Sequence, residues 1–409
     1  MAASKPIIIA GAARTPLGSF GGALSGLSCT ELGSFAIEGA LRRVRCTKAS
    51  EDTVRASVEE AIVGNVLSAG LGQAPARQAA LGARLKTETC CTTVNKVCSS
   101  GLKTVTYAVQ SITLGDASCV VAGGMESMSR VPYYLPMNRG EAKYRMGDKQ
   151  VWDGMIKDGL WDPYDNVHMG NCGEKCAKEF AITRQEQDDF SIESLRRALR
   201  SHREGKFKGE IEPVEVRAGR HTKVVAADEP LENLSEINED KIRSLKPAFD
   251  RKAGTITAAN ASTISDGAAA LVLMSEEKGA ELGVQPIARV LGYADAEQEP
   301  VQFPTTPAKA VKKLMGKFPE ISLQDVDAFE INEAFAAVVI ANMQLLNIPH
   351  EKVNQHGGSC AMGHPIGCSG ARILVTLLSV LRETGGRYGV AAICNGGGGA
   401  TAVLVENLQ

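Results

Sequence analysis

The sequence predicts a layered α/β protein, and two observations carry this prediction. Short apolar runs typical of buried strands alternate with segments whose apolar residues recur at helical spacing. Glycine is abundant, at 42 of 409 residues, and hydrophobic residues make up 44% of the chain, which suits an interior where backbones pack closely. A chain of this length exceeds one typical hydrophobic core, so we expect two or three domains or subdomains.

The first third of the chain contains the alternation most clearly. "PIIIAGA" at 6–12 and "EAIVGNVL" at 60–67 are expected to be buried strands, with a helix at 31–44 between them. "NKVCSSGLKTV" at 95–105 leads into a second helix, and "ASCVVAGGMESMS" at 117–129 forms a strand that ends in a glycine turn. Strand–helix–strand units of this kind predict layers of sheet and helix.

The middle of the chain is more polar and irregular, and we interpret it as a long insertion. Its clearest helix covers 183–206, with Thr183 as the expected N-cap. Long insertions inside compact domains are usually functional, so a ligand-binding loop subdomain is expected. The predicted organisation is an N-terminal half at 1–127, completed by about 264–286, an insertion at 128–263 and a C-terminal half at 287–409.

The last third returns to the pattern of the first. Strands are expected at 267–275 and 287–295, a strand, turn and helix at 325–346, a helix at 369–384 and a glycine-interrupted hairpin at 388–407. The two parts share this alternation, although their sequence identity is too weak to prove a duplication.

Composition excludes several kinds of partner. A net charge of −2 favours neither nucleic acid nor an acidic membrane, and no apolar run reaches the roughly 20 residues of a membrane span. The 11 cysteines are irregularly spaced, which favours a reducing compartment over a disulfide framework. Neither a signal peptide nor a terminal "SKL" is evident, so we expect a cytoplasmic protein, or a mitochondrial-matrix one if a transit peptide has been removed.

Cys98 is the first candidate for chemistry. It lies at or just before the start of a predicted helix whose apolar face includes Leu102, Val105, Val109 and Ile112. Free backbone N–H groups and the helix dipole favour a thiolate at such a position. A small buried structural cysteine is the alternative interpretation, and the position alone does not decide between them.

Two histidines compete for the role of proton acceptor. His364, in "GHPIGCSGAR", stands between Gly363 and Pro365, whose backbone preferences fix its position and allow close approach to a ligand. His356, in "QHGG", is the second candidate. Either histidine could instead be structural.

Cys394 and Asn332 lie at predicted turns. Cys394 precedes four glycines in "CNGGGGA", which predict either an anion-binding nest of N–H groups or a tight hairpin around a buried cysteine. No suitable helix follows, which excludes a dinucleotide fingerprint. Asn332, in "EINEAFAA", is either the N-cap of the next helix or a group that positions water or an oxyanion.

Together these residues predict acyl transfer coupled to carbon–carbon bond formation. One cysteine would accept the acyl group, and the other would transfer a proton. A histidine would activate the first thiol, while the glycine nest and Asn332 would donate hydrogen bonds to developing oxyanions.

Five motifs in this order resemble the thiolase family over essentially the whole chain: "NKVCSSGLK", "GGMESMS", "NEAFAA", "GHPIGCSGAR" and "CNGGGGA". Within the family, "HMG" at 168–170 resembles the biosynthetic branch, where Met169 would line and shorten the acyl pocket. The resemblance implies a thiolase fold, with two similar α/β halves stacked as a five-layered αβαβα core and an inserted loop domain.

The resemblance also implies acetyl-CoA C-acetyltransferase activity, the reversible condensation of two acetyl-CoA to acetoacetyl-CoA plus CoA. Cys98 would attack the thioester while His364 takes its proton, and Cys394 would deprotonate the second acetyl-CoA. His364 and a water held by Asn332 would form one oxyanion hole, and the backbone N–H groups of Cys98 and Gly396 would form the other.

Coenzyme A would contact the insertion, and no covalently bound cofactor is implied. The positions that match the family's CoA contacts are Tyr164, His168, Lys241 and Ser262. Lys241 suits a nucleotide phosphate. Glu236 departs from the pattern, because mitochondrial relatives have arginine at this part of the adenine and phosphate contact.

A potassium site and a homotetramer are further implications of the resemblance. "QFP" at 302–304 resembles the potassium-responsive subtype, which tolerates branched acyl chains, and 139–154 resembles a tetramerisation loop that joins two tight dimers. Carbonyl oxygens suit a hard cation. The ion would be bound by Tyr164 and by the carbonyl groups of Ala258, Ala259, Ala261 and Cys360, the last of which replaces a valine.

Three alternatives share parts of this pattern. A degradative 3-ketoacyl-CoA thiolase with a longer acyl pocket has the same catalytic residues, and Met169 argues against it. A decarboxylating ketoacyl synthase normally lacks the second cysteine, Cys394. A non-catalytic CoA- or lipid-binding relative would have no reason to retain Cys98, Asn332, His364 and Cys394.

Overall fold

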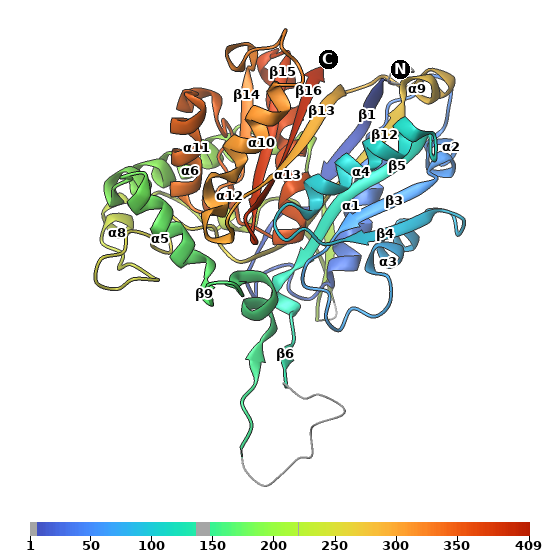
Figure 1. Cartoon of the computed structure of the whole chain (residues 1–409). Helices are drawn as coiled ribbons and strands as arrows, with labels where there is room; N and C mark the ends of the chain where they lie inside the picture. Colours follow the sequence, from blue (N-terminus) through green and yellow to red (C-terminus); the bar gives the residue numbers. More distant parts are fainter. Residues whose placement is uncertain (1–5, 136–147, 220) are drawn as a thin grey trace.

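The computed structural model describes residues 6–135, 148–219 and 221–409. A ten-stranded mixed sheet runs through it in the order β14-β15-β16-β13-β1-β12-β5-β3-β4, with β2 paired to β12 beside this path (Figure 1). The strands are β1 (Ile7–Arg14), β2 (Gly18–Ser19), β3 (Glu60–Gly64), β4 (Cys90–Val94), β5 (Cys119–Ser127), β12 (Ser265–Ser275), β13 (Ala288–Glu297), β14 (Ala328–Ile331), β15 (Tyr388–Asn395) and β16 (Gly399–Asn407).

The sheet consists of two halves joined along one short seam. Strands β1 and β13 pair only at Ile7–Ile9 and Ala288–Val290, where antiparallel register links the N-terminal strands to the C-terminal ones. Strands β1, β5 and β12 are buried along their whole length, which explains their continuous apolar runs. Strand β12 lies between β1 and β5, so the chain returns to the N-terminal half after the middle segment.

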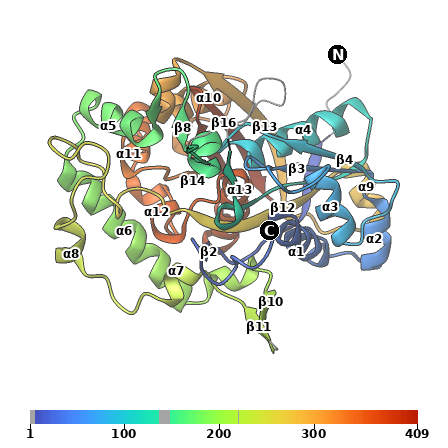
Figure 2. The ribbon, with the colours of Figure 1, turned by 90° about the horizontal axis from the view of Figure 1, so that it is seen from below.

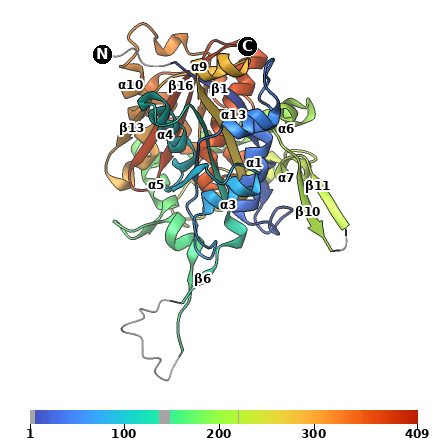
Figure 3. The ribbon, with the colours of Figure 1, turned by 90° about the vertical axis from the view of Figure 1, so that its right-hand side faces the viewer.

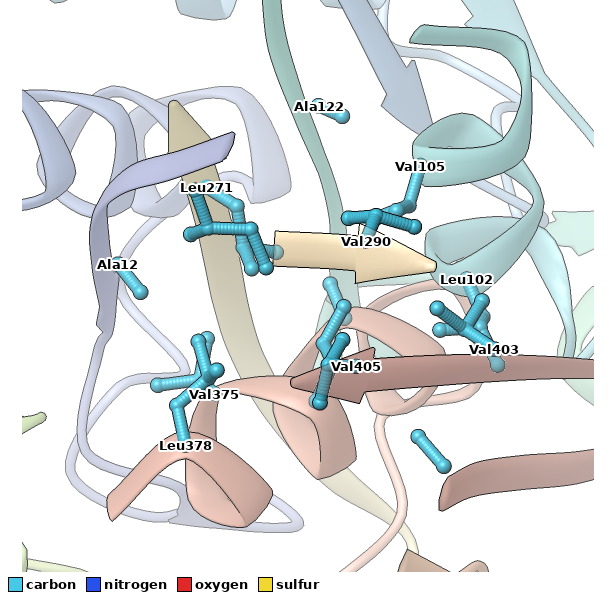
Figure 4. Close-up of a cluster of buried hydrophobic side chains, with 14 of the residues drawn as sticks. Ala12, Leu102, Val105, Ala122, Leu271, Val290, Val375, Leu378, Val403 and Val405 are labelled. Atoms are coloured by element: carbon cyan, nitrogen blue, oxygen red, sulfur yellow. The ribbon is translucent and has the colours of Figure 1, made fainter. Parts of the chain in front are cut away.

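Helices cover both faces of each half-sheet. Helices α4 (Ser100–Leu114) and α13 (Ile366–Thr384) lie between the halves, and Figure 4 shows their side chains meeting those of strands from both. Helices α1 (Cys29–Arg42) and α3 (Pro75–Gly82) pack on the outer face of the N-terminal half. Helices α10 (Thr306–Met315) and α11 (Ala336–Leu346) pack on the outer face of the other half. The predicted αβαβα layering is confirmed.

The two central helices cross at a very short distance through glycines. A Cβ added to Gly101 of α4 would lie 2.8 Å from the Ala371 nitrogen and 2.9 Å from the Gly367 oxygen of α13. A Cβ on Gly370 would likewise lie 2.4 Å from the Leu102 nitrogen. Only glycine permits this approach of two backbones. The crossing brings the start of α4, which follows Cys98, against the start of α13, which follows His364.

The middle segment forms small ribbons and helices around this core. Figure 2 shows α5, α6 and α8 on the side of the C-terminal half, and Figure 3 shows the β10–β11 ribbon and the β6 region leaving the body in different directions. Thr183 caps α6 in a capping box with Glu186, as predicted. The elements are β6 (Tyr133–Tyr134), β7 (Trp152–Asp153), β8 (Trp161–Asp162), β9 (Val167–His168), β10 (Val214–Ala218), β11 (His221–Val225), α5 (Met169–Glu179), α6 (Arg184–Arg203), α7 (Glu229–Glu232) and α8 (Glu239–Arg243).

Three further short α-helices are α2 (Glu51–Ser57), α9 (Glu276–Leu282) and α12 (Ser359–Met362). Among the described residues, no helix combines the length and apolar character needed to cross a membrane. Most of the predicted tetramerisation loop at 139–154 lies outside the described residues, which omit 136–147.

Candidate active site

Cys98 lies in a tight turn between β4 and α4, as the sequence predicts. Val97 has φ +47°, a left-handed conformation that β-branched residues rarely adopt, and its N–H donates to Asn95 Oδ1 at 2.9 Å. The Ser100 hydroxyl donates to the Val97 carbonyl at 2.6 Å and accepts the Lys96 N–H at 2.8 Å. These bonds hold Cys98 directly before the helix, where strain of this kind is often functional.

Burial, more than the helix end, sets the protonation of Cys98. It raises the pKa of this thiol to about 12, although hydrogen bonds from the backbone N–H groups of Gly396 and of Cys98 itself act in the opposite direction. The carboxylate of Glu126 raises the pKa further. Desolvation outweighs the favourable effect of the helix N-terminus here, so the pKa of this thiol stays above its ordinary value. Cys98 rests as a thiol and needs a base.

The glycine turn after Cys394 closes a β-hairpin, and it also directs a backbone N–H group towards Cys98. Strands β15 and β16 pair Cys394 with Ala400, and Gly397 and Gly398 take φ +87° and +95° in the turn between them. Gly396 directs its N–H to Cys98. Cys394 is buried, and burial followed by the nearby Cys98 raises its thiol pKa well above the usual value. The two sulfur atoms thus face one site from different halves of the fold.

Asn332 and His364 form the second part of the site. Asn332 follows β14, where its N–H donates to the Ala392 carbonyl on β15 at 3.1 Å, two residues before Cys394. Helix α11 begins only at Ala336, so the interpretation of Asn332 as an N-cap is wrong. Its Nδ2 lies 3.5 Å from Nε2 of His364, and both side chains are buried. The backbone N–H of His364 donates a hydrogen bond to the Thr263 carbonyl at 3.0 Å.

His356 has a different environment. Its Nε2 lies 3.3 Å from Glu383 Oε2, and its ring packs edge-on against Phe207. It makes no contact with Asn332 or His364 among the hydrogen bonds of the described residues. His364, and not His356, belongs to the candidate site.

Glu126 is a buried residue of the site that sequence reasoning missed, although it lies in the quoted "GGMESMS". Its carboxylate accepts the N–H groups of Val66, Leu67 and Gly367 at 3.1, 3.2 and 2.9 Å. Burial raises its pKa to about 7. Glu126 therefore ties the segment after β3 to the first turn of α13.

A cleft of about 540 Å³ opens beside Gly396 and Val97, the residue that precedes Cys98. Val97, Tyr164, Met169 and Gly396 line it, and a Cβ on Gly396 would lie 3.4 Å from Sδ of Met169. The other lining residues come from four separate segments, and most of them lie in no motif quoted from the sequence. They are Val66, Ser68, Asn95, Lys157, Asp158, Gly159, Trp161, Asp162, Pro163 and Gly397.

The other three residues predicted to bind CoA lie in different environments. The ring of His168 caps α5, accepting the Gly170 N–H at 3.0 Å, and stacks on Phe249 with ring centres 4.8 Å apart. The Ser262 N–H donates to the Ala334 carbonyl, beside the turn that bears Asn332. Lys241 is exposed on α8 and is not among the described residues that line the cleft.

The residues predicted to bind potassium through their carbonyl groups lie in two places: Ala258, Ala259 and Ala261 are in or beside one turn, and Cys360 is on α12. The Thr257 and Asn260 carbonyls accept the N–H groups of Ala261 and Ala336. Among the hydrogen bonds of the described residues, the carbonyls of Ala258, Ala259, Ala261 and Cys360 accept none.

The burial of His364 predicts acid sensitivity. Burial, then the nearby Arg372, lowers the pKa of His364 to about 3 from an ordinary 6.5. Below pH 6.5 the unfolded chain binds a proton that the folded chain does not, so stability falls as the pH falls from 6.5 towards 3. Each pH unit is worth about 1.4 kcal/mol, or about 3 kcal/mol between pH 6.5 and 4.5.

Urea unfolding of the wild type and of His364→Asn at pH 7 and pH 4.5 measures how much His364 contributes to the loss of stability in acid. We expect the wild type to lose about 3 kcal/mol more than the variant on acidification, because the other titrating groups are common to both. Equal losses in the two proteins would show that His364 is protonated in the folded state.

Comparison with known proteins agrees with this geometry. The chain matches the families described as "Thiolase, N-terminal domain" over residues 7–277 and "Thiolase, C-terminal domain" over residues 284–407. It is 52% identical to acetyl-CoA acetyltransferase 1 of Arabidopsis thaliana over 402 residues, which cover 98% of this chain and 94% of that one. It is 46% identical to acetyl-CoA acetyltransferase of Saccharomyces cerevisiae, with 99% and 100% covered.

Solved structures show the same relationship. The acetyl-CoA acetyltransferase of Bacillus anthracis superposes with a TM-score of 0.93 at 37% identity, covering 100% of both chains. A thiolase from Ascaris suum in complex with coenzyme A gives 0.90 at 42% identity, covering 99% of this chain and 100% of that one. Fold and site define an enzyme that transfers acyl groups between thiols. The chain belongs to the thiolase family.

Proposed function

We propose that this protein is an acetyl-CoA C-acetyltransferase that condenses two acetyl-CoA to acetoacetyl-CoA and CoA, and catalyses the reverse thiolysis. One observation carries the proposal: Cys98 and Cys394 face one site beside a cleft that Met169 narrows. Two thiols are required when one holds an acyl group while the other moves a proton. The activity named for the similar proteins is the same.

Acetylation starts from the resting thiols. Cys98 passes its proton to Nε2 of His364, and its sulfur attacks the carbonyl carbon of acetyl-CoA. The backbone N–H groups of Cys98 and Gly396, which point at this sulfur, stabilise the oxyanion that forms beside it. The bond between the carbonyl carbon and CoA sulfur breaks, and the CoA thiolate takes the proton of Cys394. Cys98 now carries the acetyl group, and Cys394 is a thiolate.

Condensation uses the two charged groups that the first step leaves, the Cys394 thiolate and the protonated His364. The Cys394 thiolate removes a proton from the methyl group of the second acetyl-CoA, and the resulting enolate attacks the acetyl carbonyl on Cys98. The new carbon–carbon bond forms as the carbon–sulfur bond to Cys98 breaks, and the Cys98 thiolate recovers its proton from His364. Protonated His364 and a water held by Asn332 stabilise the enolate oxygen meanwhile. Removing one such donor typically costs about 2.7–4 kcal/mol of barrier.

Ligand contacts away from the reacting atoms are part of the proposal. Tyr164 and Met169 lie in the cleft that would take the pantetheine and acyl group, and His168, Ser262 and Lys241 would contact the rest of CoA. Potassium would bind near Tyr164, and its carbonyl ligands would come from Ala258, Ala259, Ala261 and Cys360. A homotetramer is proposed as well, to be measured by light scattering.

Chain-length preference tests the proposed substrate. We expect initial-rate thiolysis to favour acetoacetyl-CoA strongly over a 3-keto-C8-CoA, because Met169 limits the space beside Gly396. Met169→Ala should raise the relative rate of the C8 substrate at least about 10-fold, the effect of about one methylene of pocket space. Met343→Ala, on α11, serves as a control that leaves the ratio unchanged. Parallel assays with and without potassium test the cation.

Good turnover of the long substrate by the wild type would favour the runner-up function, a degradative 3-ketoacyl-CoA thiolase. An unchanged ratio in Met169→Ala would show that this side chain does not close the pocket. Activity on 2-methylacetoacetyl-CoA decides whether branched substrates are accepted.

A further inference from the structure

Two buried serines lie directly behind Asn332 and His364. The Ser359 hydroxyl, on α12, is 2.7 Å from Asn332 Oδ1. The Ser369 hydroxyl, in the first turns of α13, is 2.6 Å from His364 Nδ1. Both serines are 0% exposed, so water does not compete for these bonds. Neither serine reaches the cleft, and the mechanism above uses neither.

The direction of the hydrogen bonds on the Asn332 side is fixed by Arg372. Its Nη2 donates to Ser359 Oγ at 3.2 Å, and a guanidinium has no acceptor. The Ser359 hydrogen is therefore directed to Asn332, and the atom that receives it must be the amide oxygen. The NH₂ group of Asn332 then points at His364 Nε2, 3.5 Å away.

The direction on the His364 side is fixed by a carbonyl group. The Ser369 hydroxyl lies 3.0 Å from the Pro365 carbonyl oxygen, which only accepts, so its hydrogen is directed there. The Ser369 oxygen must then accept a hydrogen from His364, which places the imidazole proton on Nδ1. Nε2 is left with a lone pair, facing the NH₂ group of Asn332.

We propose that these bonds form one chain of fixed direction, from the Arg372 guanidinium through Ser359, Asn332, His364 and Ser369 to the Pro365 carbonyl. In this chain Ser369 and Ser359 are positioning residues, which keep Nε2 of His364 unprotonated, so that it can accept the Cys98 proton in place of its hydrogen bond from Asn332. The proposal deepens the proposed function and rests on it.

The chain also couples proton transfer to oxyanion binding. When Nε2 takes the Cys98 proton it becomes a donor, and the Asn332 NH₂ group loses its acceptor. Two N–H donors then face the same place, free for a substrate oxygen or a water. Both N–H donors become available through the same proton transfer, so the site gains them only when negative charge has formed on the substrate. Donors that act at this stage stabilise the transition state more than the ground state, and so they accelerate the reaction.

Removal of the Ser369 hydroxyl tests the chain. In Ser369→Ala, Nδ1 loses its acceptor, and we expect kcat for acetoacetyl-CoA thiolysis to fall roughly 10- to 100-fold, by analogy with the loss when the hydrogen-bond partner of a metal-bound histidine is removed. The KM should not change, because Ser369 does not reach the cleft. The rate at which iodoacetamide alkylates Cys98 should fall with kcat, since both need Nε2 as base. Ser369→Thr keeps the hydroxyl and should restore both rates.

Ser379→Ala, on the same helix and also buried, is the matched control and should resemble the wild type. Ser359→Ala is a second, independent variant with the same expected loss of kcat, should Ser369→Ala fail to fold. Wild-type kcat and alkylation rates in both alanine variants would overturn the inference. Equal losses of kcat in Ser369→Ala and Ser369→Thr, with lowered melting temperatures, would show that Ser369 contributes only to packing. That result would also overturn the inference. A fully active His364→Ala would instead overturn the proposed function.

Discussion

Cys98→Ala is expected to lose thiolysis and condensation almost completely, with kcat/KM down at least about 10⁴-fold. The second thiol, Cys394, has the separate role of proton transfer and is not expected to replace Cys98 as the acyl acceptor. Removal of a catalytic nucleophile costs up to about 10⁶-fold in comparable enzymes. The residual rate would come from binding and the oxyanion donors alone. Initial rates with acetoacetyl-CoA plus CoA, and with acetyl-CoA alone, measure the loss in both directions.

Cys90→Ala is a matched control for this experiment. Cys90 is an exposed thiol eight residues before Cys98 on the adjoining strand β4, and it should be dispensable. Both variants should melt at the wild-type temperature, since neither removes a large buried group. A Cys98→Ala enzyme with wild-type activity would refute the assignment of the nucleophile.

Cys394→Ala should separate the two halves of the reaction. Without the second thiol, no group takes a proton from the methyl of acetyl-CoA, and we expect condensation to fall about 10²- to 10⁴-fold, the usual contribution of a general base. Cys98 can still attack acetyl-CoA, because its own base is His364, and the leaving CoA thiolate takes its proton from water in place of Cys394. The acetyl-enzyme should therefore accumulate when the variant is mixed with acetyl-CoA, and intact-protein mass spectrometry would detect it.

Cys172→Ala is the control here, because Cys172 is buried in the same apolar cluster as Cys394 but is not part of the proposed chemistry. It should condense acetyl-CoA at close to the wild-type rate. If Cys394→Ala failed to acetylate while remaining folded, both cysteines would be needed for the first step. Separate roles would then be wrong.

Local patterns in the sequence were enough to predict the elements and the principal site residues. The turn before α4, the β15–β16 hairpin and α13 are each specified by short runs of glycine, proline and periodic apolar residues. Cys98, Cys394 and His364 lie at the ends of these elements, so finding the elements located the residues. Their meeting in space followed only from the resemblance, because Cys98 precedes His364 by 266 residues and Cys394 by 296 residues.

Two features were out of reach for sequence reasoning. The protonation of Cys98 depends on how much water surrounds the sulfur, and burial raises its pKa against a helix end that sequence alone suggested would lower it. The chain through Ser359 and Ser369 depends on distances between separate elements. Ser369 and Arg372 lie within a quoted motif and are three residues apart, on one face of a helix. This spacing is the only signal in the sequence for the hydrogen-bond chain.

The most direct test of the account is to locate the covalent intermediate. The wild-type enzyme is mixed with acetyl-CoA labelled in the acetyl group, quenched in acid, and digested for peptide mapping. We predict label on the peptide that contains Cys98, and its complete loss when unlabelled CoA is added before the quench. Label on Cys394 or on another residue, or label that CoA does not remove, would contradict the account.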